Sequence, residues 1–136
     1  FDTITMWHVL EHVYNLNKDI EQYKKVLKPN GTLIIAVPNC SSKDANHYKK
    51  DWAAYDLPIH LYHFRPNNMK ELFKNHGMNL TEILPMKFDS YYISMVSEQY
   101  KNGNILKGFW NGFKSNLNAN KSNNEYSSQI YIIKNN

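Results

Sequence analysis

An apolar run at residues 32–37 restricts the fold of this chain most strongly, because its apolar residues do not alternate with polar ones. A strand of this kind is buried on both faces, as in a parallel sheet that helices cover on each side. A helical pattern at residues 17–27 precedes the run, and a β-branched and apolar run at residues 1–6 precedes that helix. A helix between two strands is the crossover of a parallel βαβ unit. The sequence therefore predicts an α/β fold.

Local signals mark the ends of the helix at residues 17–27. Asn17 is expected to cap its N-terminus, with Asp19 in the first turn. Pro29 cannot continue a helix, and Gly31 is expected to adopt the positive φ of the turn that follows. These signals place the reversal of the chain just before the apolar run.

The remaining residues predict a long loop followed by alternating helices and strands. Residues 38–57 lack a strong period and contain only a short helix near residues 46–54, and loops of this length are usually functional lids or disordered. Pro66 begins a helix that Gly77 ends. The later elements are a strand at residues 78–86, a helix capped by Asp89 or Ser90 with Tyr92, Met95, Val96 and Tyr100 on one apolar side, a helix at residues 105–117, a polar linker at residues 121–125 and a strand at residues 129–133.

Composition argues against several classes of partner. The 136 residues are 42% apolar, which is enough for one buried core. The net charge of +4 comes from scattered residues with Arg65 as the single arginine, whereas nucleic-acid-binding proteins concentrate Lys and Arg on one face. No apolar run approaches the ~20 residues of a membrane helix. The lone Cys40 fits a reducing compartment. We therefore expect a cytoplasmic protein that binds neither nucleic acid nor membrane.

Two motifs at a fixed separation resemble the second half of class I S-adenosylmethionine-dependent methyltransferases. Residues 1–13 read FDTITMWHVLEHV, residues 26–35 read VLKPNGTLII, and Pro38 and Asn39 end the strand. In the family, a strand that begins FD leads to an LEH loop, and a helix that ends in LKPGG precedes the fifth strand. Residues 56–64, DLPIHLYHF, also resemble a family segment.

The resemblance implies a partial Rossmann-like sheet of about four strands with flanking helices, in which the last strand runs antiparallel. The implied order is residues 1–6, 32–37, 129–133 and, at the edge, 78–86. Residues 1–136 would then form the carboxyl-terminal half of a methyltransferase domain, with a lid and acceptor segment at residues 39–65.

The implied activity is transfer of a methyl group from S-adenosylmethionine to a small-molecule or biosynthetic acceptor. Met6, Trp7 and His8 follow the first strand and are expected to contact the cofactor, because open α/β sheets bind ligands at the carboxyl ends of their strands. The structural alternative for Trp7 is packing beneath the next helix.

The family's Gly-rich loop and ribose-binding acidic residue have no counterpart in this sequence. Its five glycines form no G-x-G-x-x-G arrangement. We therefore expect a fragment that lacks the first three strands of the family, is inactive alone and binds the cofactor weakly. The open edge of the strand at residues 1–6 predicts self-association, most simply as a homodimer or else as aggregation.

Histidines and aromatic residues near the lid are the candidates for the acceptor side. His60 or His63 is expected to act as a general base, since a neutral imidazole can accept a proton from a hydroxyl or amine as the methyl group moves. Each could instead orient the acceptor or hydrogen-bond the lid backbone. Trp52, Tyr55 and Tyr62 are expected to bind the acceptor, although aromatic residues at helical spacing are more often part of a core.

Two other functions remain as alternatives. Residues 8–12 read H-x-x-E-H, an inverted zinc-protease signature in which His8 and His12 bind zinc and Glu11 is the base. That signature lies within a long helix, whereas here it follows a strand directly, so no metal is expected. The second alternative is a non-catalytic interaction module built on the same half-sheet.

Overall fold

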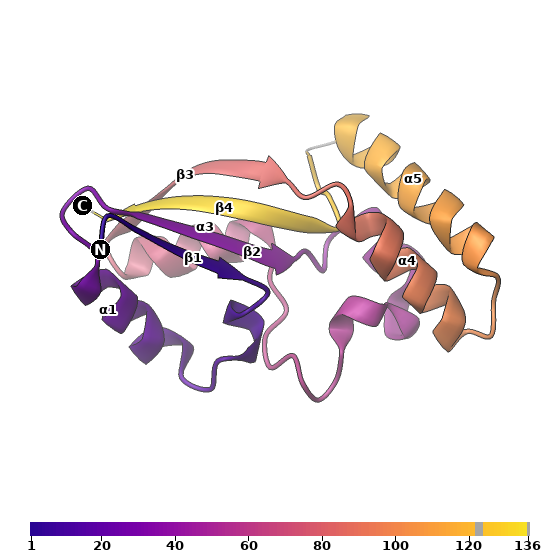
Figure 1. Ribbon diagram of the computed structural model, residues 1–136, viewed down its shortest axis with the longest axis horizontal. Coiled ribbons are helices and arrows are strands. Elements are labelled where there is room, and N and C mark those ends of the chain that lie inside the picture. The colour runs from indigo at the N-terminus through magenta and orange to yellow at the C-terminus, as the bar shows by residue number, and fades with distance from the viewer. Residues whose placement is uncertain (122–123, 136) are drawn as a thin grey trace.

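A computed structural model describes residues 1–121 and 124–135, which form a four-stranded sheet with helices packed on it (Figure 1). The strands are β1 (Thr3–Trp7), β2 (Thr32–Pro38), β3 (Met78–Pro85) and β4 (Ser128–Asn135). They are arranged in the order β1-β2-β4-β3. β1 and β2 are parallel, whereas β4 is antiparallel to both of its neighbours. This arrangement confirms the predicted α/β class and the insertion of the last strand between two others.

The main hydrophobic core lies on one face of the sheet. Leu33 and Ile35 of β2 are fully buried in it. Ile34 pairs with Ile132 on the opposite face, and both side chains are only partly buried. The expectation that β2 is buried on both faces therefore holds only for its carboxyl-terminal part, where Ala36 and Pro38, on the same face as Ile34, are buried. The buried residues of this core are Met6, Leu10, Ile20, Leu27, Leu33, Ile35, Val37, Phe64, Met69, Phe73, Met78, Tyr131 and Ile133.

Two helices, α1 (Leu16–Val26) and α3 (Pro66–Asn75), contribute to this core. α1 includes Asn17 in its first turn, so the expectation that Asn17 is the N-cap is wrong. Its first residue packs against the core, which accounts for the earlier start. α3 begins at its proline, as predicted, and Gly77 leaves the helix with a φ of 66°.

The turn between α1 and β2 reverses the chain through Asn30, which has a φ of 62°. The expectation that Gly31 has the positive φ is therefore wrong. Gly31 is required for another reason, because a Cβ atom there would lie 2.8 Å from the carbonyl oxygen of Lys28.

The long segment after β2 folds into short helices. These are α2 (Lys43–Tyr48) and the 3₁₀ helices Lys49–Asp51 and Ala53–Tyr55, so the short helix expected near residues 46–54 begins earlier and is divided. The buried carboxylate of Asp44 accepts hydrogen bonds from Trp52 Nε1 at 2.9 Å, Ser115 Oγ at 2.7 Å and Ser127 Oγ at 2.6 Å. These donors come from three segments, so Asp44 joins them in a second core.

Helices α4 (Asp89–Tyr100) and α5 (Ile105–Lys121) pack side by side beyond the carboxyl ends of β1 and β2 (Figure 1). Small residues allow their backbones to approach closely. A Cβ atom on Gly108 would lie 2.6 Å from Met95 Cα, and one on Gly112 would lie 2.6 Å from the Ser90 carbonyl oxygen.

Two expectations about this part of the chain are wrong. Asp89 is the first residue of α4 and Phe88 precedes it, so neither Asp89 nor Ser90 is the N-cap. α5 continues beyond the predicted end at residue 117. Residues 122 and 123 of the predicted linker lie outside the described residues. In the described part of the chain, no helix is both long and apolar enough to span a membrane.

Candidate functional site

A cavity of about 420 Å³ opens where β1 and β2 end, between the loop after β1, the 3₁₀ helix Ala53–Tyr55 and α4. This is the edge of an open α/β sheet at which ligands bind. The residues that line it are His8, Pro38, Ala53, Ala54, Asp56, His60, Asp89, Tyr92, Ile93, Val96 and Tyr100. Of the predicted site residues, His8 and His60 therefore meet in one cavity.

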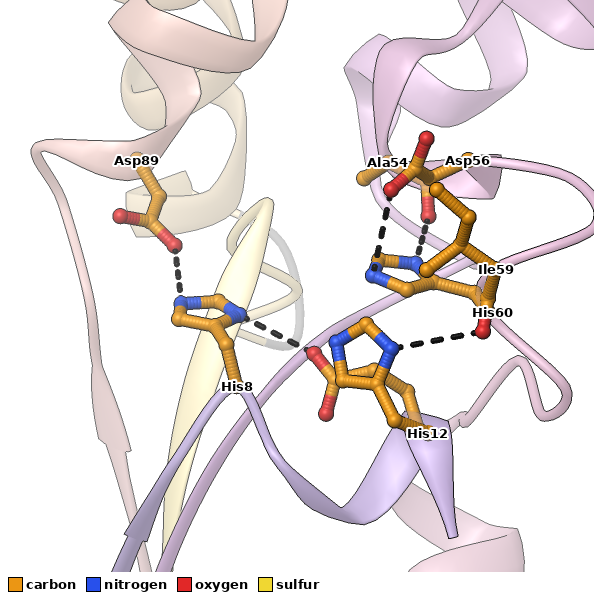
Figure 2. Close-up of polar contacts among 8 residues, drawn as sticks. His8, His12, Ala54, Asp56, Ile59, His60 and Asp89 are labelled. Atoms are coloured by element: carbon orange, nitrogen blue, oxygen red, sulfur yellow. Dashed lines mark hydrogen bonds and ion pairs between the residues drawn. The ribbon is translucent and has the colours of Figure 1, made fainter. Parts of the chain in front are cut away.

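The imidazole of His8 lies between two carboxylates. Its Nε2 is 3.0 Å from Asp89 Oδ2, and its Nδ1 is 3.2 Å from Glu11 Oε1 (Figure 2). The hydrogen bond to Asp89, followed by that to Glu11, raises the pKa of His8 from 6.5 to about 9. A positive φ of 53° turns the chain at His8, while its backbone N–H still donates to the Ala36 carbonyl. His8 is therefore a protonated, firmly held side chain near neutral pH.

The LEH motif forms the 3₁₀ helix Leu10–His12, directly after β1. It buries Glu11, whose side chain is 1% exposed, and leaves His12 partly exposed. Both nitrogens of His8 are engaged by carboxylates, and the motif does not lie in a long helix. The zinc-protease arrangement built on His8 and His12 is therefore not formed by these residues.

His60 and His63 lie on the segment that follows the 3₁₀ helix Ala53–Tyr55. Nδ1 of His60 is 2.8 Å from the Ala54 carbonyl oxygen, and its Nε2 is 4.0 Å from Asp56 Oδ2 (Figure 2). Nε2 of His63 is 2.9 Å from the Tyr55 carbonyl oxygen. Because a carbonyl oxygen can only accept a hydrogen bond, His60 carries its proton on Nδ1 when neutral, and its Nε2 is free to accept one.

The three residues expected to contact the cofactor lie in different environments. Met6 is 6% exposed and packs in the main core. Trp7 is 51% exposed, so packing beneath the next helix does not occur. His8 lines the cavity. Trp7 therefore offers an accessible side chain, whereas direct contact of Met6 with the cofactor stays a prediction.

The three residues expected to bind the acceptor do not line the cavity. Trp52 is buried in the second core, with its indole N–H bonded to Asp44. Tyr55 packs against Trp52 and against the ring of His63. Tyr62 packs on the main core. Direct contact of these aromatic residues with an acceptor stays a prediction.

Sequence reasoning missed the wall of the cavity that α4 supplies. The predicted apolar side of this helix comprises Tyr92, Met95, Val96 and Tyr100, and all of these residues except Met95 line the cavity. Asp89 was treated as a cap, whereas its carboxylate binds His8. The helical spacing was the available signal, but it does not distinguish a core from a cavity wall.

Comparison with a model of a methyltransferase domain family gives a match over residues 1–83. Among curated proteins, the chain is 29% identical over 86 residues to a protein assigned as polyketide synthase 10 from Dictyostelium discoideum. The aligned residues cover 60% of this chain and 4% of that protein. The chain thus corresponds to a small part of that protein.

Solved structures with the same fold include three that the chain matches over nearly its whole length. A candidate sarcosine dimethylglycine methyltransferase from Galdieria sulphuraria gives a TM-score of 0.59 at 12% identity, covering 99% of this chain and 53% of that one. Phosphoethanolamine N-methyltransferase 2 from Haemonchus contortus, in complex with S-adenosylhomocysteine, gives a TM-score of 0.54 at 18% identity. The match covers 98% of this chain and 33% of that one. A mycolic acid cyclopropane synthase in complex with S-adenosylhomocysteine gives a TM-score of 0.54 at 9% identity. The match covers 98% of this chain and 55% of that one. The chain spans about half or less of the length of these proteins.

Proposed function

Because the chain belongs to the family of methyltransferase domains, we propose that it is the carboxyl-terminal half of an S-adenosylmethionine-dependent methyltransferase acting on a small-molecule acceptor. The observation that carries this proposal is the cavity at the carboxyl ends of β1 and β2, where His8 and His60 meet. Solved structures with the same fold are complexes with S-adenosylhomocysteine. A cavity of about 420 Å³ lies within the size range of small-molecule sites.

The loop after β1 fits one side of a cofactor site. Trp7 offers an exposed aromatic ring at the carboxyl end of β1, and the positive φ of His8 turns the chain there. Met6 would support this loop from the main core, in which its side chain is buried. The glycines of this chain form no G-x-G-x-x-G arrangement, so this chain would supply only the β1 side of the cofactor site.

His60 is the proposed proton acceptor of the reaction. S-adenosylmethionine, when bound, supplies the methyl group, and its sulfur keeps the electron pair of the broken bond. The acceptor oxygen or nitrogen forms the new bond to the methyl group and loses its proton to Nε2 of His60. Donation of the Nδ1 proton to the Ala54 carbonyl leaves the lone pair on Nε2, which is then free to accept the proton.

His63 and the aromatic residues of this segment have proposed supporting roles. The rings of His63 and His60 are 6.5 Å apart, so His63 is the second candidate for the base. Tyr92 and Tyr100 line the cavity and would contact the acceptor directly. Trp52, Tyr55 and Tyr62 would do so only if the segment moves when the acceptor binds.

The test compares His60→Gln with His8→Gln in the natural protein that contains this chain. We expect His60→Gln to lower kcat by about 10²–10⁴-fold with little change in the dissociation constant of S-adenosylmethionine. His8→Gln should weaken cofactor binding more than it lowers kcat at saturation. Equal loss of cofactor affinity in both variants, with unchanged kcat, would contradict these roles. Absence of cofactor binding in the natural protein would favour the non-catalytic interaction module.

A further inference from the structure

Beside the cavity, three side chains from two separate parts of the chain bring possible metal-ligand atoms together. Glu11, His12 and His60 each offer one such atom, and these atoms all lie within 4.8 Å of one another. The rings of His12 and His60 meet edge to face, with centroids 4.7 Å apart. His12 and Glu11 are adjacent on the 3₁₀ helix after β1, whereas His60 comes from the lid segment. The fold, and not local sequence, therefore creates this cluster.

The hydrogen bonds of both histidines prepare the same ring nitrogen for coordination. Nδ1 of His12 is 3.3 Å from the Ile59 carbonyl oxygen, and Nδ1 of His60 is 2.8 Å from the Ala54 carbonyl oxygen (Figure 2). A carbonyl oxygen only accepts, so the proton of each neutral ring is on Nδ1 and the lone pair is on Nε2. Imidazoles that bind metals typically donate their other N–H to a carbonyl or carboxylate in this way.

Glu11 gives an independent indication of a missing partner. Its side chain is 1% exposed, and its Oε1 accepts a hydrogen bond from His8. Its Oε2 is buried and has no hydrogen-bond partner among the described residues. A buried carboxylate oxygen without a partner is strongly unfavourable, and buried charges are normally paired or coordinate metals. A cation bound by this carboxylate would reduce that penalty.

We propose that Glu11, His12 and His60 bind one divalent transition metal ion of the Zn²⁺, Co²⁺ and Ni²⁺ group. Two imidazole nitrogens and a carboxylate suit these ions, whereas Mg²⁺ and Ca²⁺ prefer oxygen ligands only. The site differs from the H-x-x-E-H hypothesis, because His60 replaces His8 as a ligand. His8 instead holds the carboxylate of Glu11 in place.

The proposed ion would lie in the wall of the cavity, because His60 is shared by the cluster and the cavity lining. Three protein ligands leave a coordination position open, as in catalytic zinc sites. An oxygen of the acceptor would fill it, and the ion would lower the pKa of that hydroxyl so that its proton passes to solvent water. In the metal-bound protein, Nε2 of His60 would then coordinate instead of accepting a proton.

The test is calorimetric titration of the 136-residue chain with ZnCl₂ after removal of metals by chelation, without S-adenosylmethionine. We expect one bound ion per chain, and visible absorption of four-coordinate Co²⁺ when CoCl₂ replaces ZnCl₂. His12→Ala and His60→Ala should each weaken Zn²⁺ binding by at least about 10-fold. Glu11→Gln should do the same while it keeps the shape of the buried side chain. His47→Ala removes a histidine outside the cluster and should leave binding unchanged.

Each outcome of the Zn²⁺ titration supports or overturns the proposed metal site. No Zn²⁺ binding by the wild-type chain, or equal binding by the wild type and both histidine variants, would overturn it. Circular dichroism of each variant shows whether it folds. If Glu11→Gln does not fold, the histidine variants decide the result, because both side chains are at least partly exposed. Since no cofactor is present, failure of this test would leave the proposed methyl transfer unaffected.

Discussion

His8 is constrained at both its backbone and its side chain, and both constraints affect the cavity that it lines. Its backbone turns with a φ of 53° directly after β1, a conformation that is uncommon for residues other than glycine. Its ring is fixed by Asp89 from α4 and by Glu11 from the loop after β1. One residue thus connects the end of the sheet to the helical pair, so the strength of its ionic contacts affects the geometry of the cavity.

The first prediction concerns the charge of His8 in the chain kept free of metal with a chelator. Its pKa of about 9 lies above the unfolded value of about 6.5. Protonated His8 therefore stabilises the fold fully below pH ~6.5, and this contribution is lost as pH rises through about 9. Asp89→Asn removes the larger cause of the shift, so the pKa of His8 should fall. Titration of the His8 ring protons by NMR measures this directly.

Unfolding by urea gives the second measurement for the same variant. The destabilisation caused by Asp89→Asn should be larger at pH ~6 than at pH ~10, where His8 is neutral in both proteins. Glu71→Gln removes an exposed carboxylate on α3 and is the matched control, with no change in the pKa of His8. A His8 pKa that stays the same in Asp89→Asn would show that Asp89 is not its main partner.

Single residues of the site were only partly predictable from the sequence. Recognisable sequence motifs contain His8, Glu11, His12 and His60, so the sequence alone identifies these residues as candidates for a site. Their contacts could not, because the Asp89 carboxylate and the backbone carbonyls that orient the imidazoles come from other segments. Tertiary packing determines which carboxylate pairs with which imidazole.

At the scale of elements, the close approach of α4 and α5 supports one wall of the cavity. Gly112→Ala would place a Cβ atom 2.6 Å from the Ser90 carbonyl oxygen and 2.7 Å from Tyr91 Cα. Alanine favours a helix by up to about 1 kcal/mol relative to glycine, but overpacking costs about 1–3 kcal/mol. Because both contacts are with backbone atoms, we expect a net loss of unfolding free energy in chemical denaturation.

Lys114→Ala is the control for that variant, because Lys114 is exposed on the same helix. It should change the free energy of unfolding by no more than about 0.5 kcal/mol. Equal or greater stability of Gly112→Ala would show that the two helices separate without cost, and that their contact does not support the cavity wall.

The elements themselves were more predictable than their ends. The βαβ unit followed from the apolar run at residues 32–37 and the Pro29 stop signal, both of which are local. The start of α1 did not follow, because Leu16 is recruited by its contact with the core. The burial of α4 also could not be predicted, since its serine-rich side is buried against the glycines of α5. Small residues carry no hydrophobic signal, yet they determine this packing.

At the scale of the whole molecule, the proposed function assigns to the 136 residues the acceptor side of a site and only part of its cofactor side. We therefore expect this chain to bind S-adenosylmethionine weakly or not at all, because Gly-rich turns provide the close backbone approach that the cofactor needs. Isothermal calorimetry checks this expectation with the chain alone. A low-micromolar dissociation constant would contradict it.

The sheet of this chain also has an open edge at β1. The His8 N–H and the Asp2 carbonyl bond to β2, so the backbone groups of alternate residues, Thr3, Thr5 and Trp7, point away from it. The side chains of Thr5 and Trp7 are exposed, on the same face as the partly buried Ile34. An unpaired strand edge beside apolar surface tends to pair with another chain. We expect two copies to pair their β1 strands antiparallel about a two-fold axis.

Sedimentation at tens of micromolar tests this pairing, together with hydrogen exchange at the outward amides of β1. We expect a dimer in which the amides of Thr3, Thr5 and Trp7 exchange slowly. Thr5→Lys places a charge on the edge and should shift the chain toward monomer, because lysine discourages edge pairing. Thr81→Lys makes the same substitution on β3, the opposite edge strand, and should leave the dimer intact. A monomer whose β1 amides exchange freely, or a dimer broken by Thr81→Lys alone, would exclude pairing through β1.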